Sequence, residues 1–141
     1  ITCNNLKMPA KALIYFNKLL SRDKNNVDVL INKGYSLHLM GKYGRAILCY
    51  KQVLKQDPDE INAIYYMSKS TARQNDAKQT CELISKLLKL QFINDLDHDH
   101  DHDHDHDHNH KQVHLIEKIQ KDSDFKRMRT NANFLFLLKH N

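Results

Sequence analysis

The sequence has little glycine, proline or cysteine and no tryptophan, and these shortages exclude several kinds of protein. Only three Gly and two Pro occur in 141 residues, too few for a β-sandwich or barrel, in which each hairpin needs its own turn residues. The three Cys are odd in number and widely spaced, which argues against a disulfide framework and for a reducing, cytoplasmic location. No apolar run approaches the roughly 18 residues that cross a bilayer, so we expect no membrane association. These absences favour one all-α domain.

The charge of the chain is unevenly distributed. Lys and Arg number 22 against 17 Asp and Glu, a net charge of +5, but residues 97–110 contain six Asp and no Lys or Arg. The remainder therefore carries 22 − 11 = +11. Its basic residues are scattered along polar helix faces and form no compact cluster, so we do not expect a nucleic-acid partner. No Ser/His/Asp spacing, glycine-rich phosphate loop or metalloprotease motif occurs, and we predict that the chain is not an enzyme.

Residues of similar character recur at an interval of 34 positions. The series are Ala12, Ala46 and Thr80; Phe16, Tyr50 and Ile84; and Leu20, Leu54 and Leu88. A fixed interval of this length predicts a stack of similar structural units, each burying its apolar face against its neighbours.

The clearest unit runs from Val27 to Glu60. Leu30, Gly34 and Leu37 share one face of a first predicted helix, and Ala46 and Tyr50 share one face of a second. This unit resembles a tetratricopeptide repeat, whose pattern of small, large and aromatic residues it matches in register. The resemblance implies an all-α, helix-turn-helix solenoid with capping helices at its C-terminal end.

The period divides the chain into three predicted regions. Residues 1–92 are tetratricopeptide-like: a half repeat at 10–26, a repeat at 27–60 and a degenerate repeat at 61–92. Residues 93–110 form a disordered loop rich in Asp and His. Residues 111–141 form a helical cap, because their apolar spacing is again helical and the acidic break at Asp122-Ser123-Asp124 predicts an N-cap.

The resemblance also implies a ligand groove, lined by the first helix of each unit. The predicted groove residues are Asp28, Asn32, Tyr35, His38, Tyr65, Tyr66, Lys69 and Arg73. Aromatic, amide and cationic side chains together suit a peptide with an acidic feature. The alternative for each of these residues is an ordinary solvated helix face.

The alternating Asp/His tract is the second candidate site. Its predicted metal ligands are His98, His100, His102, His104, His106, His108 and His110. Imidazole and carboxylate groups bind Zn(II), and imidazole also suits Ni(II), so either ion is a candidate ligand, although no cofactor is required. The alternative is a low-complexity expansion of a tolerated surface loop.

We therefore predict a non-catalytic protein-interaction module that holds a peptide or partner helix in its groove. The alternative function is metal buffering or metal response through the Asp/His tract.

Overall fold

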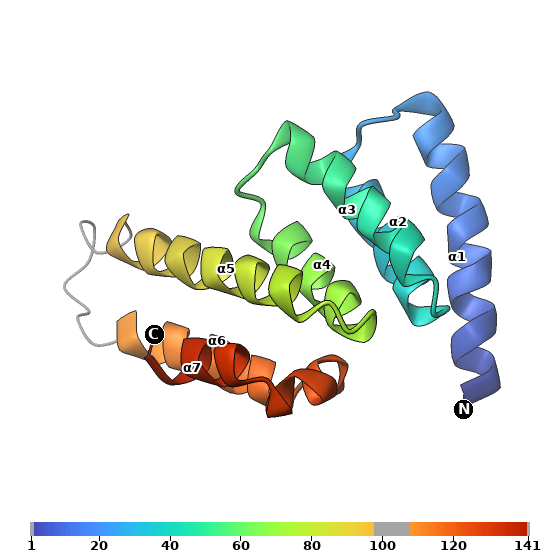
Figure 1. Ribbon diagram of the computed structural model, residues 1–141. Coiled ribbons are helices and arrows are strands. Elements are labelled where there is room, and N and C mark those ends of the chain that lie inside the picture. Colours follow the sequence, from blue (N-terminus) through green and yellow to red (C-terminus); the bar gives the residue numbers. More distant parts are fainter. Residues whose placement is uncertain (1, 98–107, 141) are drawn as a thin grey trace.

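The computed structural model describes residues 2–97 and 108–140, and these residues form helices joined by short turns (Figure 1). In chain order the helices are α1 (Thr2–Arg22), α2 (Val27–Leu39), α3 (Tyr43–Gln56), α4 (Ile61–Arg73), α5 (Ala77–Asp97), α6 (His108–Lys121), the 3-10 helix η2 (Ser123–Thr130) and α7 (Ala132–His140). The described residues contain no strand. The prediction of an all-α, helix-turn-helix stack is confirmed.

The pair α2 and α3 is the unit that the sequence shows most clearly. It begins where Asn26 caps α2 by accepting a hydrogen bond from the Val29 amide at 3.2 Å. Gly41 forms the turn between the helices at φ +78, a conformation that favours glycine. A Cβ atom on Gly34 would lie 2.5 Å from Cε1 of Tyr50. The absent side chain therefore lets the two helices approach closely.

The pair α4 and α5 repeats this arrangement with different residues. Asn75, at φ 62, occupies the turn in place of a glycine. Thr80 stands where the preceding unit has Ala46, and its buried hydroxyl lies 2.8 Å from that of Thr71 on α4. The hydrogen bond between the two threonine hydroxyls therefore satisfies the buried polar group that Thr80 introduces and that an alanine would lack.

Three predicted boundaries differ from the observed helices. α1 starts at Thr2, well before the half repeat expected at 10–26, and it includes Pro9. Residues 93–97, expected in the loop, belong to α5, and residues 108–110 belong to α6. α5 continues to Asp97 because no Gly or Pro interrupts its sequence. Residues 98–107, the centre of the predicted loop, lie outside the described residues.

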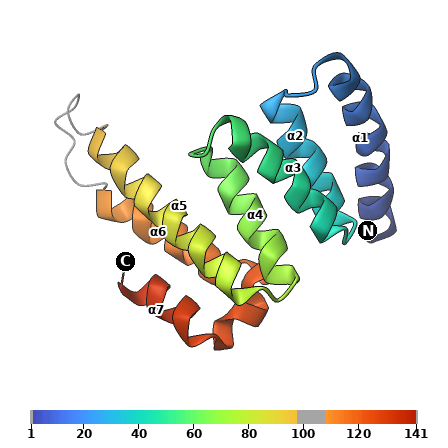
Figure 2. The same cartoon turned by 45° about the horizontal axis from the view of Figure 1, so that its top comes forward.

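The C-terminal segment folds back against the second unit. α6 and α7 lie beside α5 and η2 contacts α4, at the opposite end of the molecule from α1 (Figures 1 and 2). Phe125, Met128 and Phe134 from η2 and α7 are fully buried, and they share one apolar core with Ile84 and Leu87 of α5. This burial makes the segment an integral part of the fold.

Candidate functional site

Two helices from successive units provide all eight residues of the predicted groove. Asp28, Asn32, Tyr35 and His38 belong to α2, and Tyr65, Tyr66, Lys69 and Arg73 belong to α4. The two helices contact each other, and we call the side on which these residues lie the α2–α4 face. The structure divides the eight residues into an open group and a covered group.

The open group lies mainly on α2. Asp28, Asn32 and Tyr35 are exposed, and Tyr35 retains 39% of its accessible surface. Its ring lies 5.5 Å from that of Tyr66, and the Tyr66 ring stacks in turn on fully buried Tyr50. The Tyr66 ring, itself stacked on Tyr50, therefore supports one side of Tyr35, and part of Tyr35 remains accessible to a partner.

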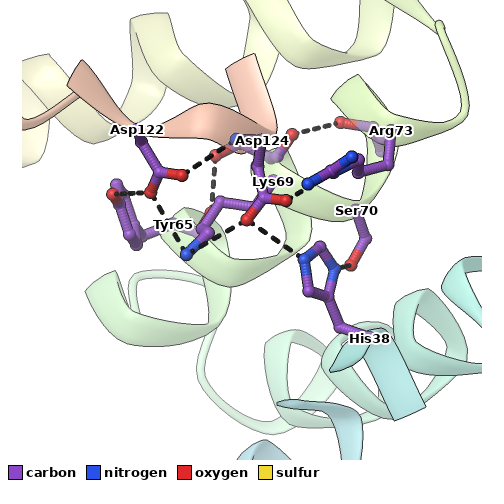
Figure 3. Close-up of polar contacts among 9 residues, drawn as sticks. His38, Tyr65, Lys69, Ser70, Arg73, Asp122 and Asp124 are labelled. Carbon is purple, nitrogen blue, oxygen red and sulfur yellow. Dashed lines mark hydrogen bonds and ion pairs between the residues drawn. The ribbon is translucent and has the colours of Figure 1, made fainter. Parts of the chain in front are cut away.

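The covered group lies under η2. His38 and Tyr65 are buried, and the Lys69 side chain is only 15% exposed. Two carboxylates, Asp122 and Asp124, reach this part of the face from the N-terminal end of η2 (Figure 3). The α4 half of the face is thus occupied by a segment of the same chain.

Asp124 makes the larger number of contacts. Its Oδ2 atom accepts a hydrogen bond from Nε2 of His38 at 3.1 Å and lies 3.3 Å from Nζ of Lys69. Its Oδ1 atom accepts from Nε of Arg73 at 2.5 Å. Three basic side chains from two helices therefore surround one carboxylate that is 10% exposed.

Asp122 binds the neighbouring positions of α4. Its Oδ2 atom accepts from the Tyr65 hydroxyl at 2.9 Å and lies 3.1 Å from Nζ of Lys69. Its Oδ1 atom accepts from the Asp124 amide at 3.0 Å, which confirms the predicted N-cap. Lys69 thus bridges both carboxylates, and its Nζ also lies 5.6 Å from the centre of the Tyr65 ring.

The charges in this cluster stabilise one another. Burial disfavours ionisation of Asp124, but hydrogen bonds from His38 and Arg73 and the charge of Lys69 outweigh it and hold its pKa well below the usual range. Burial also opposes the charge on Lys69, yet Asp122 and Asp124 raise the pKa of its ammonium group. Burial and the adjacent Asp122 raise the pKa of Tyr65. The cluster therefore holds the Asp124 carboxylate in its ionised form.

Ser70, His38 and Asp124 form a hydrogen-bonded series. Nδ1 of His38 lies 2.8 Å from Oγ of Ser70, and its Nε2 contacts Asp124. Because a carboxylate only accepts, Nε2 carries the proton of that bond. Ser70 has no accessible surface and His38 has 6%, so the serine oxygen is closed to a substrate. The series joins α2, α4 and η2 as a structural link.

The sequence pattern did not identify three members of this cluster as site residues: Ser70, Asp122 and Asp124. We expected the two aspartates only at a helix start. The sequence does contain a signal for this site: Asp122 and Asp124 flank Ser123, and the nearest charged residues on either side of this short segment are basic. Their pairing with α4 depends on a contact 51 residues apart in sequence between Arg73 and Asp124, which local patterns do not predict.

The predicted metal site cannot be placed. His98, His100, His102, His104 and His106 lie outside the described residues, and the side chains of His108 and His110 are not described either. Within the part of the chain that the structure describes, no three His, Cys, Asp or Glu side chains gather in a way that could hold a metal ion. Metal binding by the tract stays a prediction.

Comparison with known families identifies the central unit. The tetratricopeptide repeat model matches residues 27–60, the same residues that form α2, α3 and the turns beside them. The chain contains a tetratricopeptide repeat. This match confirms the predicted repeat at 27–60, and a tetratricopeptide repeat supports a general role as a protein-interaction module. Among curated proteins, no match to this chain was found.

None of the helices in the described residues combines the length and apolar character that crossing a membrane requires.

Proposed function

We propose that this tetratricopeptide repeat protein binds a peptide or a helix of a partner protein on the open part of the α2–α4 face. The binding residues would be Asp28, Asn32 and Tyr35, with Tyr66 beside them. The chain's own C-terminal segment would occupy the rest of the predicted groove, where it is bound by His38, Tyr65, Lys69 and Arg73.

The observation that carries the proposal is the intramolecular contact on the other half of the face. There, cationic and aromatic side chains of α4 hold the Asp122-Ser123-Asp124 turn through hydrogen bonds and ion pairs. The same face therefore binds polypeptide within this molecule. Next to that contact, a partly exposed aromatic side chain, an amide and a carboxylate remain accessible on α2, and these groups are suited to protein recognition.

A displayed peptide library provides a test that needs no known partner. Peptides selected on the intact protein should bind at least roughly tenfold more weakly to Tyr35→Ala, because aromatic anchors carry much of the energy of such contacts. Tyr15→Ala is the matched control, since Tyr15 is 60% exposed on α1. Selected peptides that bind Tyr35→Ala and the intact protein equally would refute the proposal.

The Asp/His tract supports a second proposal, metal buffering or metal response, on the sequence alone. Isothermal titration with Zn(II) and with Ni(II) should show binding to the intact chain and none after deletion of residues 97–110. If partner binding also requires the metal, the tract is the functional element. If partners bind equally without residues 97–110, the tract is not needed for the interaction.

A further inference from the structure

A second surface lies where α5 and α7 contact each other. A groove of about 670 Å³ opens between these helices, a volume typical of binding sites. One wall is formed by α5, with Cys81 and Ser85 at its centre. The other wall is formed by α7, with Phe136 and Leu137.

The α7 wall presents accessible apolar surface beside the amide of Asn133. Phe136 retains 62% of its accessible surface. A large aromatic side chain that lines a groove while remaining this exposed can lose much apolar surface to water when a ligand is bound. The wall therefore favours a ligand with an apolar face.

The α5 wall is basic. Lys78, Lys86 and Lys89 line the groove together with a single acidic residue, Glu82, which gives a local net charge of +2. Lys86 donates to the Pro58 carbonyl at 2.6 Å. Lys78 and Lys89 are exposed and have no ion-pair partner among the described side chains. Two ammonium groups are thus free to pair with an acidic ligand.

The two lysines also suggest the size of the ligand. They are separated by 11 positions of one helix, which corresponds to about 16 Å along its axis. A bound helix of about 12 residues spans the same distance. From these walls and this spacing we infer that the α5–α7 groove is a docking site for an acidic amphipathic helix of a partner protein. The apolar face of that helix would lie on Phe136, and its carboxylates would pair with Lys78 and Lys89.

The probe for this site is a synthetic, fluorescein-labelled amphipathic peptide of about 12 residues, with leucines on one face and glutamates on both edges. Fluorescence anisotropy should show binding that strengthens as salt is lowered. Replacing both Lys78 and Lys89 by Glu should weaken it by roughly tenfold or more at low salt. Phe136→Ala should weaken it as well, at all salt concentrations.

Two controls separate the groove from general charge effects. Lys51→Glu combined with Lys55→Glu makes the same change in net charge at exposed positions of α3, and it should leave most of the affinity. A peptide with lysine in place of every glutamate should bind weakly. A local measurement is alkylation of Cys81 by iodoacetamide, mapped by mass spectrometry, which the bound acidic peptide should slow.

Several results would overturn the inference. The inference fails if the lysine peptide binds as tightly as the acidic one, or if the α3 variant weakens binding as much as the Lys78 and Lys89 variant. It also fails if the peptide leaves Cys81 alkylation unchanged, or if no binding is detected at about 1 mM peptide. A dimer that forms with rising concentration and disappears in Phe136→Ala would show that a second copy occupies the groove instead. Tyr35→Ala should not change binding of this peptide; if it abolishes binding, the peptide lies on the α2–α4 face and only this inference fails.

Discussion

Replacement of Asp124 by Asn removes the central charge of the link between the repeats and the cap. The side chain keeps its size, but its amide nitrogen places a donor where His38, Lys69 and Arg73 also donate. Removing one partner of a buried ion pair costs about 3–5 kcal/mol of unfolding free energy. We discount this figure because the Arg73 side chain is 40% exposed and Lys69 keeps Asp122. The expected loss is about 2–3 kcal/mol.

Urea unfolding followed by circular dichroism, with linear extrapolation to water, measures this loss. The matched control is Asp59→Asn, which removes a carboxylate that is 68% exposed and 3.8 Å from the Lys86 ammonium. That change should cost less than about 1 kcal/mol, as exposed pairs do. If Asp124→Asn were no more destabilising than Asp59→Asn, the cluster would not hold the cap in place.

The same carboxylate predicts how stability depends on pH. The pKa of Asp124 is lower in the folded protein than the usual value of about 3.9, so the unfolded chain takes up this proton first. Its contribution is complete above the unfolded pKa and is lost as pH falls through the folded pKa. The stability difference between the intact protein and Asp124→Asn should therefore be constant near neutral pH and shrink below about pH 4. A constant difference down to about pH 2 would contradict this assignment.

Three further substitutions test the packing that positions the site. Phe125→Ala should lower the free energy of unfolding by about 3–5 kcal/mol in the same urea assay, because this fully buried ring stacks on Phe134 at 5.9 Å; a loss below about 1 kcal/mol would place the cap outside the core. Gly34→Ala should destabilise by about 1–3 kcal/mol, since its Cβ would lie 2.5 Å from the Tyr50 ring, whereas Gly44→Ala, which meets only Gln74 at 3.4 Å, should not. Tyr50→Phe removes a buried hydroxyl without a hydrogen-bond partner among the described residues, so thermal unfolding should show stability unchanged or higher by up to about 1 kcal/mol.

The helical units could be predicted because their signals are local. The helical spacing of Leu30, Gly34 and Leu37, and that of Ala46 and Tyr50, is read within a few residues, and the family match at 27–60 confirms the unit that they predict. The boundary at 92 was less accurate, since composition alone suggested a loop where an uninterrupted helix continues to Asp97. Helix ends depend on competing local and tertiary contacts, so composition defines them poorly.

The candidate site could be predicted only in part. The resemblance assigned the eight groove residues to the first helices of two successive units, and in the structure they lie on α2 and α4, with Asp28, Asn32 and Tyr35 exposed. The register could not show that η2 returns to cover Tyr65 and Lys69, because that contact joins residues 57 apart, Tyr65 and Asp122. The α5–α7 groove was also missed, since α7 and α5 are distant in sequence and each looks like an ordinary amphipathic helix.

The central claim is that the chain binds a partner on α2 while its own cap occupies α4. Amide chemical-shift mapping of the protein with a library-selected peptide tests this directly. The account predicts shifts at Asp28, Asn32 and Tyr35, with the amides of Lys69, Arg73 and Asp124 unchanged. Shifts concentrated at Lys69 and Arg73, together with release of Asp122 and Asp124, would contradict it.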